Sequence, residues 1–155
     1  MAESERAGAL LMKAALLTAP GGLENQDHGL VIDEGVRLVL CIADGAGGCG
    51  GAREAAIMAT DFVSRNAPQL NDAEACADLL RQLDAALAGD PVAGETTCAL
   101  AIVTPEFVFG ASVGDSGIWM IPQSGQHQDL TSGQQRKPFI GSGSAWPVPF
   151  HRRRL

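Results

Sequence analysis

Residues 38–51 read Leu-Val-Leu-Cys-Ile-Ala-Asp-Gly-Ala-Gly-Gly-Cys-Gly-Gly, an apolar run that ends in an aspartate and a glycine-rich loop. Because the six residues before the aspartate are all apolar, the segment 36–43 predicts a strand that is buried on both faces. An aspartate directly after such a strand is costly to bury unless it is paired, hydrogen-bonded or bound to a metal ion. Asp44 is therefore the first candidate for a functional residue.

Further strand signals lie on the amino-terminal side of this run. Residues 29–33 form a short apolar segment, and Glu34-Gly35 makes a plausible turn into residues 36–43, so the two segments predict a β-hairpin. Residues 9–18 are also apolar, but their periodicity fits a strand or a helix equally well. Pro20-Gly21-Gly22 ends that segment in either case.

Two helices are expected after the glycine-rich loop. The first ends at Pro68, and the second opens with Asn71 and Glu74 at the N-cap and N3 spacing of a capping box and closes at Gly89. Apolar residues at helical spacing predict the buried faces. They are Ala55, Ala56, Ala59, Phe62 and Val63 in the first helix and Cys76, Leu79, Leu80, Leu83 and Leu87 in the second.

Three strands are expected next, at residues 97–104, 107–113 and 117–121. The remainder is rich in Gly, Ser, Gln and Pro and is expected to be weakly structured. Strands, two consecutive helices and further strands indicate an α+β fold, with the helices on one face of an antiparallel sheet. The expected organisation is a disordered lead at 1–8, one domain at 9–150 and a basic tail at 151–155.

Charge and composition exclude some classes of function. The net charge is −7, and it divides into −12 up to Asp129 and +5 after it, which argues against nucleic-acid binding because phosphates are neutralised by basic side chains. The acidic amino terminus is unlike a secretion signal, and no apolar run reaches the ~18 residues of a membrane span. Cys41, Cys49, Cys76 and Cys98 match no zinc or disulfide spacing. We expect a cytoplasmic protein with buried, reduced thiols and no membrane partner.

Three aspartates stand beside predicted strands: Asp27, Asp44 and Asp115. Two carboxylates 4 Å apart repel by about 1 kcal/mol in water and by about 4 kcal/mol at an effective dielectric of 20. Mg²⁺ or Mn²⁺ would reverse that sign, since both ions favour oxygen ligands, and the Gly45 carbonyl could contribute one. Each aspartate taken alone is equally compatible with an ordinary turn.

A second interpretation concerns the loop itself. Gly45–Gly50 matches the dinucleotide-binding pattern G-x-G-x-x-G, after a strand and before a helix. Asp44 at the mouth of the loop would repel a pyrophosphate, however, and residues 61–66 are helical where that fold needs the end of a second strand. The pattern therefore disfavours a dinucleotide.

Four short motifs resemble, in order and spacing, the signatures of the PPM-type (type 2C) protein phosphatases, and the resemblance runs from about residue 10 to residue 122. The motifs are Asn25-Gln26-Asp27, Ala43-Asp44-Gly45-Ala46-Gly47-Gly48, Gly94-Glu95-Thr96-Thr97 and Val113-Gly114-Asp115-Ser116.

The resemblance implies a β-sandwich flanked by helices, with Mn²⁺ or Mg²⁺ ions at one end. It implies that Asp44 bridges two ions, that the Gly45 carbonyl binds one of them, that Asp27 holds a bound water and that Asp115 helps to hold a third ion. A phosphorylated protein would be the substrate, and a metal-activated water would hydrolyse its phosphoserine or phosphothreonine.

The chain departs from the family pattern at several positions. Gly22 replaces the arginine that grips phosphate, Gln26 replaces a common acid, Ala46 and Cys49 stand where histidines are frequent, and Gly117 replaces an arginine. The family's two later metal-binding aspartates have no counterpart here, so the resemblance implies a carboxyl-terminally truncated, incomplete domain with exposed sheet edges that favour self-association. The alternative to an active phosphatase is a catalytically inactive phosphatase-like module that acts in protein binding or regulation.

Overall fold

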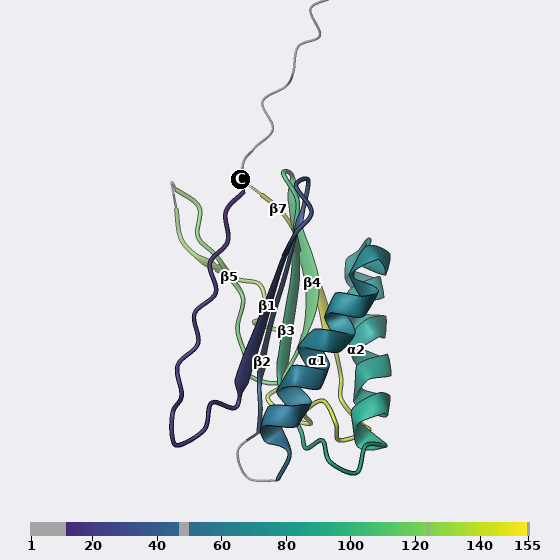
Figure 1. Ribbon diagram of the computed structural model, residues 1–155. Helices are drawn as coiled ribbons and strands as arrows, with labels where there is room; N and C mark the ends of the chain where they lie inside the picture. Colours follow the sequence, from purple (N-terminus) through teal and green to yellow (C-terminus); the bar gives the residue numbers. More distant parts are fainter. Residues whose placement is uncertain (1–11, 47–49, 124, 155) are drawn as a thin grey trace, which may run out of the picture.

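The computed structural model describes residues 12–46, 50–123 and 125–154, which form an α+β fold (Figure 1). A five-stranded antiparallel sheet has the order β1-β2-β3-β4-β7, and β5 and β6 form a two-stranded sheet. The strands are β1 (Asp27–Asp33), β2 (Leu38–Asp44), β3 (Cys98–Val103), β4 (Phe107–Val113), β5 (Trp119–Met120), β6 (Gln128–Asp129) and β7 (Val148–Arg153). The helices are α1 (Ala52–Asn66), a short 3₁₀ helix (Ala67–Gln69) and α2 (Ala73–Ala88).

The β1–β2 hairpin fixes the register that later matters for the site. Gly35 has a φ of 79°, which a glycine adopts without strain, and its N–H donates to Asp33 Oδ1 over 2.8 Å. The turn at Glu34-Gly35 is thus confirmed. From it the two strands pair residue by residue, from Asp33 opposite Leu38 to Asp27 opposite Asp44.

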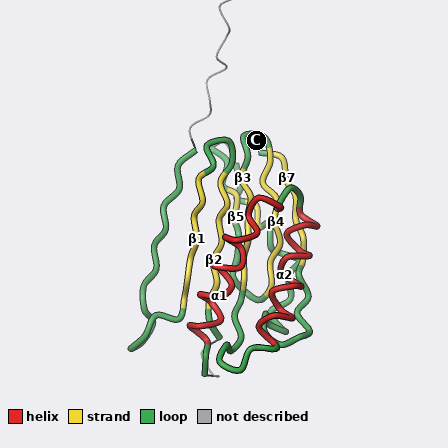
Figure 2. The backbone as a smooth tube through the Cα atoms, turned by 45° about the vertical axis from the view of Figure 1, so that its right-hand side comes forward, coloured by secondary structure: helices red, strands yellow, loops and turns green. Residues whose placement is uncertain are grey.

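Both helices lie on the same face of the sheet, as Figure 2 shows. The predicted buried face of α2 is confirmed at all of its positions, and that of α1 at all but Phe62, which is partly buried. The buried face of α1 consists mostly of alanines and packs on β1 and β2. Together the two faces cover Val39, Leu100 and Ile102, none of which is exposed to solvent.

The start of α2 differs from the expectation by one residue. Asp72, rather than Asn71, is the N-cap, and its side chain accepts a hydrogen bond of 2.7 Å from the Ala75 N–H. Asn and Asp cap helices about equally well, so two adjacent candidates cannot be separated by residue type alone.

The sheet face opposite the helices is only partly covered. Residues around β5 and β6 pack on it, and Ile118, Met120 and Leu130 contact its apolar cluster. Ile42 nevertheless keeps 41% of its surface exposed, so the prediction that residues 36–43 are buried on both faces is wrong. The strand expected at 117–121 is likewise reduced to β5, since its pairing with β6 is only two residues long.

The carboxyl-terminal part is more ordered than expected. Residues 148–153 form β7, which pairs with β4 from Phe107 to Ser112, so the expectation of a weakly structured remainder is wrong there. Buried Phe150 anchors this strand, and its position at the sheet edge tolerates Pro149. Arg152 and Arg153, expected in a basic tail, are exposed on this edge. Self-association through the β1 or β7 edge stays a prediction.

The amino-terminal segment lies beside β1 without forming a helix or strand of its own. This applies to residues 12–18, whereas the expected disordered lead at 1–8 falls outside the described residues. A Cβ at Gly29 would lie 2.3 Å from Leu16 Cδ1, so the segment packs closely on β1 at this point. No helix in the described part of the chain is long and apolar enough to cross a membrane.

The fold also decides between the two interpretations of the glycine-rich loop. A dinucleotide-binding unit needs parallel strands on either side of its helix. Here β2 and β3, which precede and follow the two helices, pair antiparallel. The dinucleotide interpretation is therefore excluded.

Three of the four cysteines are buried free thiols, as expected: Cys41, Cys76 and Cys98. The sulfur atoms of Cys41 and Cys98 lie 3.5 Å apart between neighbouring strands. Burial, with the charge of Asp72 adding to it, raises the pKa of the Cys76 thiol to about 12, so this thiol stays protonated. Cys49 lies outside the described residues.

We predict that Leu83→Ala lowers the free energy of unfolding by about 2–5 kcal/mol, because the side chain is fully buried between α2 and the sheet and its removal leaves a cavity. Urea denaturation measures this loss. Gln82 precedes Leu83 and is exposed, so it offers a matched control. Gln82→Ala should change the free energy of unfolding by less than about 0.5 kcal/mol. Equal effects of the two substitutions would contradict the packing described here.

Candidate metal centre

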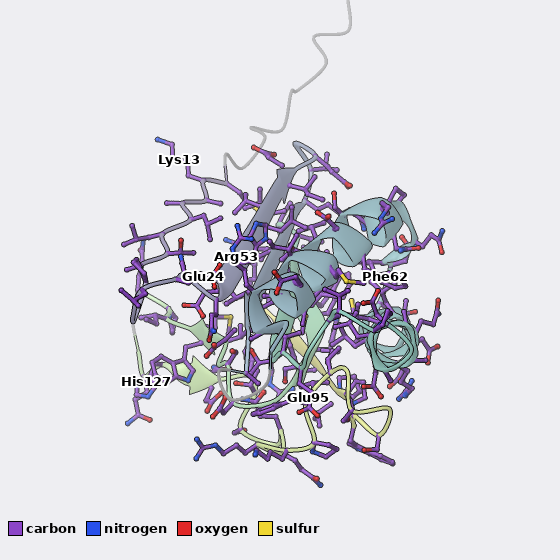
Figure 3. The ribbon with its side chains drawn as sticks, turned by 60° about the horizontal axis from the view of Figure 1, so that its bottom comes forward. Lys13, Glu24, Arg53, Phe62, Glu95 and His127 are labelled. Atoms are coloured by element: carbon purple, nitrogen blue, oxygen red, sulfur yellow. The ribbon has the colours of Figure 1, made fainter. Side chains whose placement is uncertain are left out.

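The described residues of all four sequence motifs lie at one end of the sheet. Because neighbouring strands are antiparallel, β1 begins, β2 ends, β3 begins and β4 ends at this end. Asp27 is the first residue of β1, Asp44 is the last of β2, and Asp115 follows β4. Figure 3 brings this end of the molecule forward.

Asp27 and Asp44 form the centre of the site. They are direct partners across the β1–β2 pair, an arrangement in which like charges are destabilising. The pKa of Asp44 is raised from 3.8 to about 6 by burial first, then by its hydrogen bond with Asp27 and by the negative charges of Asp27 and Asp115. The main chain of Asp27 is held in turn, since its N–H donates to Asn25 Oδ1 over 3.1 Å.

The Gly94–Thr97 motif holds the backbone of Asp44. The Asp44 carbonyl accepts from the Thr97 N–H at 2.9 Å and from the Thr96 hydroxyl at 3.0 Å, and the Asp44 N–H donates to Thr97 Oγ1 at 3.0 Å. Both threonines are buried. The motif in the sequence indicated no role for these two threonines, although a pair of β-branched hydroxyl residues beside a predicted strand was the available signal.

Gly45 is required by its surroundings. A Cβ there would lie 2.4 Å from the Ala52 carbonyl oxygen and 2.9 Å from that of Gln26, so any side chain would clash with backbone. The Gly45 N–H donates to the Gln26 carbonyl at 3.2 Å. Among the described residues, no hydrogen-bond donor reaches the Gly45 carbonyl, which leaves that oxygen available to a cation.

Asp115 is near the pair but has another partner. Its Oδ2 lies 2.9 Å from Arg136 Nε, in an ion pair that is largely exposed to solvent. The next residue ties this loop to the same threonine that holds Asp44, because Ser116 Oγ lies 2.6 Å from Thr97 Oγ1. Arg136, more than twenty positions along the chain, was not foreseen as a neighbour of the site.

A cavity of about 600 Å³ opens beside the aspartate pair, lined by residues 21–27 and by Asp44. Gly22 contributes no side chain to it. At its rim Glu24 Oε1 lies 3.8 Å from Arg53 Nε, and Figure 3 shows these two side chains next to each other. Arg53 belongs to the first turn of α1 and does not itself line the cavity, so it lies near the cavity only through its ion pair with Glu24.

The donor set fits a hard divalent cation with few protein ligands. Within the described ranges, no three His, Cys, Asp or Glu side chains are grouped so that they could hold a metal ion together. Asp27 and Asp44 are therefore a two-carboxylate pair, and Asp115 acts on it through its charge. Mg²⁺ is commonly held by one or two carboxylates and keeps several waters, which such a pair beside an open cavity permits.

Comparison with known proteins identifies the family whose pattern these motifs follow. The family model described as protein phosphatase 2C matches residues 19–141. A search of the curated proteins finds no match. Among solved structures, a bacterial serine phosphatase carrying a point mutation is 25% identical with a TM-score of 0.65, and the match covers 84% of this chain. The chain spans 65% of the length of that phosphatase, less than two thirds.

Two more distant structures share the fold. RsbX in complex with magnesium has a TM-score of 0.69 at 16% identity, with 88% of this chain and 64% of RsbX covered. The catalytic domain of the serine/threonine protein phosphatase PstP, in complex with two manganese ions, has a TM-score of 0.67 at 15% identity, with 85% of this chain and 67% of that domain covered.

We predict that Asp44→Asn stabilises the metal-free protein above pH 6. Between pH 3.8 and about 6 the folded state binds more protons at Asp44 than the unfolded state, so the free energy of unfolding falls as pH rises through this window. The amide keeps the shape of the protonated carboxyl and carries no charge. Thermal melts in a chelator at about pH 8 should therefore give the variant the higher melting temperature, and the difference should vanish below pH 3.8.

The matched control is Asp61→Asn, which removes the same charge from an exposed position on α1. It should leave the melting temperature nearly unchanged at both pH values. A metal-free wild type as stable as Asp44→Asn at about pH 8 would contradict the electrostatic description of the pair.

Proposed function

Because this chain belongs to the protein phosphatase 2C family, we propose that it binds Mn²⁺ or Mg²⁺ between Asp27 and Asp44 and hydrolyses phosphoserine or phosphothreonine in protein substrates. The observation that carries the proposal is the opposed pair itself, with the pKa of Asp44 raised to about 6. Support also comes from related structures, of which one contains magnesium and another two manganese ions.

The residues of the pair have a defined part in this proposal. Asp27 and Asp44 offer carboxylate oxygens, and the Gly45 carbonyl offers a third oxygen from a position where only glycine fits. A bound ion would supply the positive charge and Lewis acidity that phosphoryl transfer to water requires. In the metal-free chain the same oxygens repel one another, so binding relieves an existing electrostatic penalty.

The cavity accounts for substrate binding in the same proposal. Its lining carries three carboxylates, from Glu24, Asp27 and Asp44, so it would accept a phosphorylated side chain only with a divalent cation bound to the aspartate pair. Arg53 at its rim can donate two parallel hydrogen bonds to phosphate oxygens, a geometry that guanidinium groups favour. Arg53 would thus bind the substrate phosphate, a role that the resemblance assigns to an arginine at the position of Gly22. Asp115 as a ligand of a further ion also remains a proposal, and it requires that the ion displace Arg136.

A second candidate function is a phosphatase-like module that binds a phosphorylated protein without hydrolysing it. Two observations favour it: no third carboxylate completes the Asp27–Asp44 pair among the described residues, and Asp115 is already paired with Arg136. Binding of phosphate needs only the cation and Arg53, whereas hydrolysis needs the attacking water to be held in line as well. The two candidates differ in turnover and agree in metal binding.

We predict manganese-dependent release of phosphate from a phosphothreonine peptide by the full chain. Asp44→Asn and Asp27→Asn should each lower kcat/KM by about 100-fold or more, the loss typical of removing one group that stabilises transition-state charge. Phosphate release is measured with manganese and with chelator, and Mn²⁺ should raise the melting temperature of the wild type but not of Asp44→Asn.

Asp61→Asn serves again as the control and should keep wild-type turnover. Absence of turnover, together with Mn²⁺-dependent binding of the labelled phosphopeptide over its unphosphorylated form, would select the second candidate. A wild type whose melting temperature does not respond to Mn²⁺ would rule out both.

A further inference from the structure

Asp84 is a buried carboxylate outside the candidate metal centre. It lies on α2 with only 6% of its surface exposed, and its oxygens accept hydrogen bonds from three backbone amides of one turn. The N–H groups of Gly141 and Gly143 donate to Oδ1 at 2.8 and 3.0 Å, and that of Ala145 donates to Oδ2 at 3.0 Å. Such charge-assisted bonds compensate for burial of the carboxylate and fix the turn to α2.

The turn held by Asp84 is joined directly to the site. Fully buried Ile140 exchanges two backbone hydrogen bonds with Thr96, of 2.9 and 3.0 Å. Gly141 has a φ of 101°, and a Cβ there would lie 2.6 Å from the Gly94 carbonyl oxygen. The turn therefore packs without a gap against the Gly94–Thr97 motif.

The Gly94–Thr97 motif in turn contacts Asp44. The Thr96 hydroxyl donates to the Asp44 carbonyl at 3.0 Å. On the other side of the turn, Phe139 packs under the Asp115 loop, since a Cβ at Gly114 would lie 3.3 Å from Phe139 Cδ1. Segments that carry two of the three site aspartates thus rest on one turn, and Asp84 holds that turn.

We infer that Asp84 is a positioning residue for the candidate metal centre: through the turn at 139–145 it sets the Thr96–Thr97 segment that fixes Asp44. This inference rests on the proposed function, because it assigns Asp84 to the binding of a divalent cation by the Asp27–Asp44 pair. Residues that orient metal ligands from the outside commonly change metal affinity by about 10- to 100-fold when they are replaced.

The substitution that tests this role is Asp84→Asn, which keeps the size of the side chain. An amide offers one acceptor oxygen, and its NH₂ group would face one of the turn's N–H groups, so part of the turn loses its hydrogen bonds. The matched control is Asp72→Ala, which removes the N-cap of the same helix and lowers stability without touching the turn. Ser142→Ala, which removes a 2.6 Å bond to the Phe139 carbonyl, is a milder variant within the turn.

Two readouts on the full chain separate positioning from general destabilisation. The first is amide hydrogen exchange of the metal-free protein, in which Asp84→Asn should selectively lose protection at Thr96 and Thr97. The second is Mn²⁺ affinity from the electron paramagnetic resonance signal of free Mn²⁺, which should weaken by about 10-fold or more. Asp72→Ala should lower the melting temperature and leave both readouts as in the wild type, and Ser142→Ala should move both in the direction of Asp84→Asn.

The other possible results also show whether Asp84 positions the Asp44 segment. Unchanged exchange at Thr96 and Thr97 in a folded Asp84→Asn would overturn it, and so would wild-type Mn²⁺ affinity alongside altered exchange. If Asp84→Asn does not fold, Ser142→Ala gives the answer by the same two criteria. A wild type that binds no Mn²⁺ would refute the proposed function, and the exchange data would then show separately whether Asp84 fixes the Asp44 segment.

Discussion

The repulsion between two carboxylates that face each other across β1 and β2 is the interaction on which the rest of the site depends. The register brings Asp27 and Asp44 together at the end of the hairpin, where burial and the two neighbouring charges raise the pKa of Asp44 to about 6. A chain gains no stability from such a pair on its own. A divalent cation would turn the same arrangement into a favourable one, and this is the physical reason for proposing that the pair binds a metal ion.

Hydrogen bonds to the backbone around Asp27 and Asp44 keep the two residues together despite the repulsion between their carboxylates. Asp44 is held by three hydrogen bonds to Thr96 and Thr97, which are themselves paired with Ile140 and, through Ser116, with the Asp115 loop. The helices supply the apolar support on one face, while the opposite face is left partly open, as the exposure of Ile42 shows. The backbone of Asp44 is therefore held in place, and a polar cavity of about 600 Å³ lies beside it.

Local signals in the sequence predicted the α+β class, the hairpin turn, both helices and most of their buried faces, because each depends on residues that are close in the chain. Contacts between distant residues could not be read in this way. Nothing in the sequence distinguishes Asp84 from other polar residues on a helix, because its hydrogen-bond donors lie in a turn more than fifty residues later. Arg136 reaches Asp115 in the same manner. Residues 148–153 follow a stretch rich in Gly, Ser and Pro and contain Pro149, so no local signal indicates a strand, and they form one by pairing with the free edge of β4. At the site, Asp27 and Asp44 were nominated from their places beside strands, but their direct opposition follows from the register.

Anomalous diffraction at the manganese edge, from crystals of the full chain grown with Mn²⁺, tests the central claim most directly. We predict an anomalous peak between the carboxylates of Asp27 and Asp44, within about 2.0–2.6 Å of at least one oxygen of the pair. An Asp44→Asn crystal grown under the same conditions should lack it. A well-diffracting wild-type crystal with no peak between these two residues, or with Mn²⁺ bound elsewhere on the chain, would contradict the account.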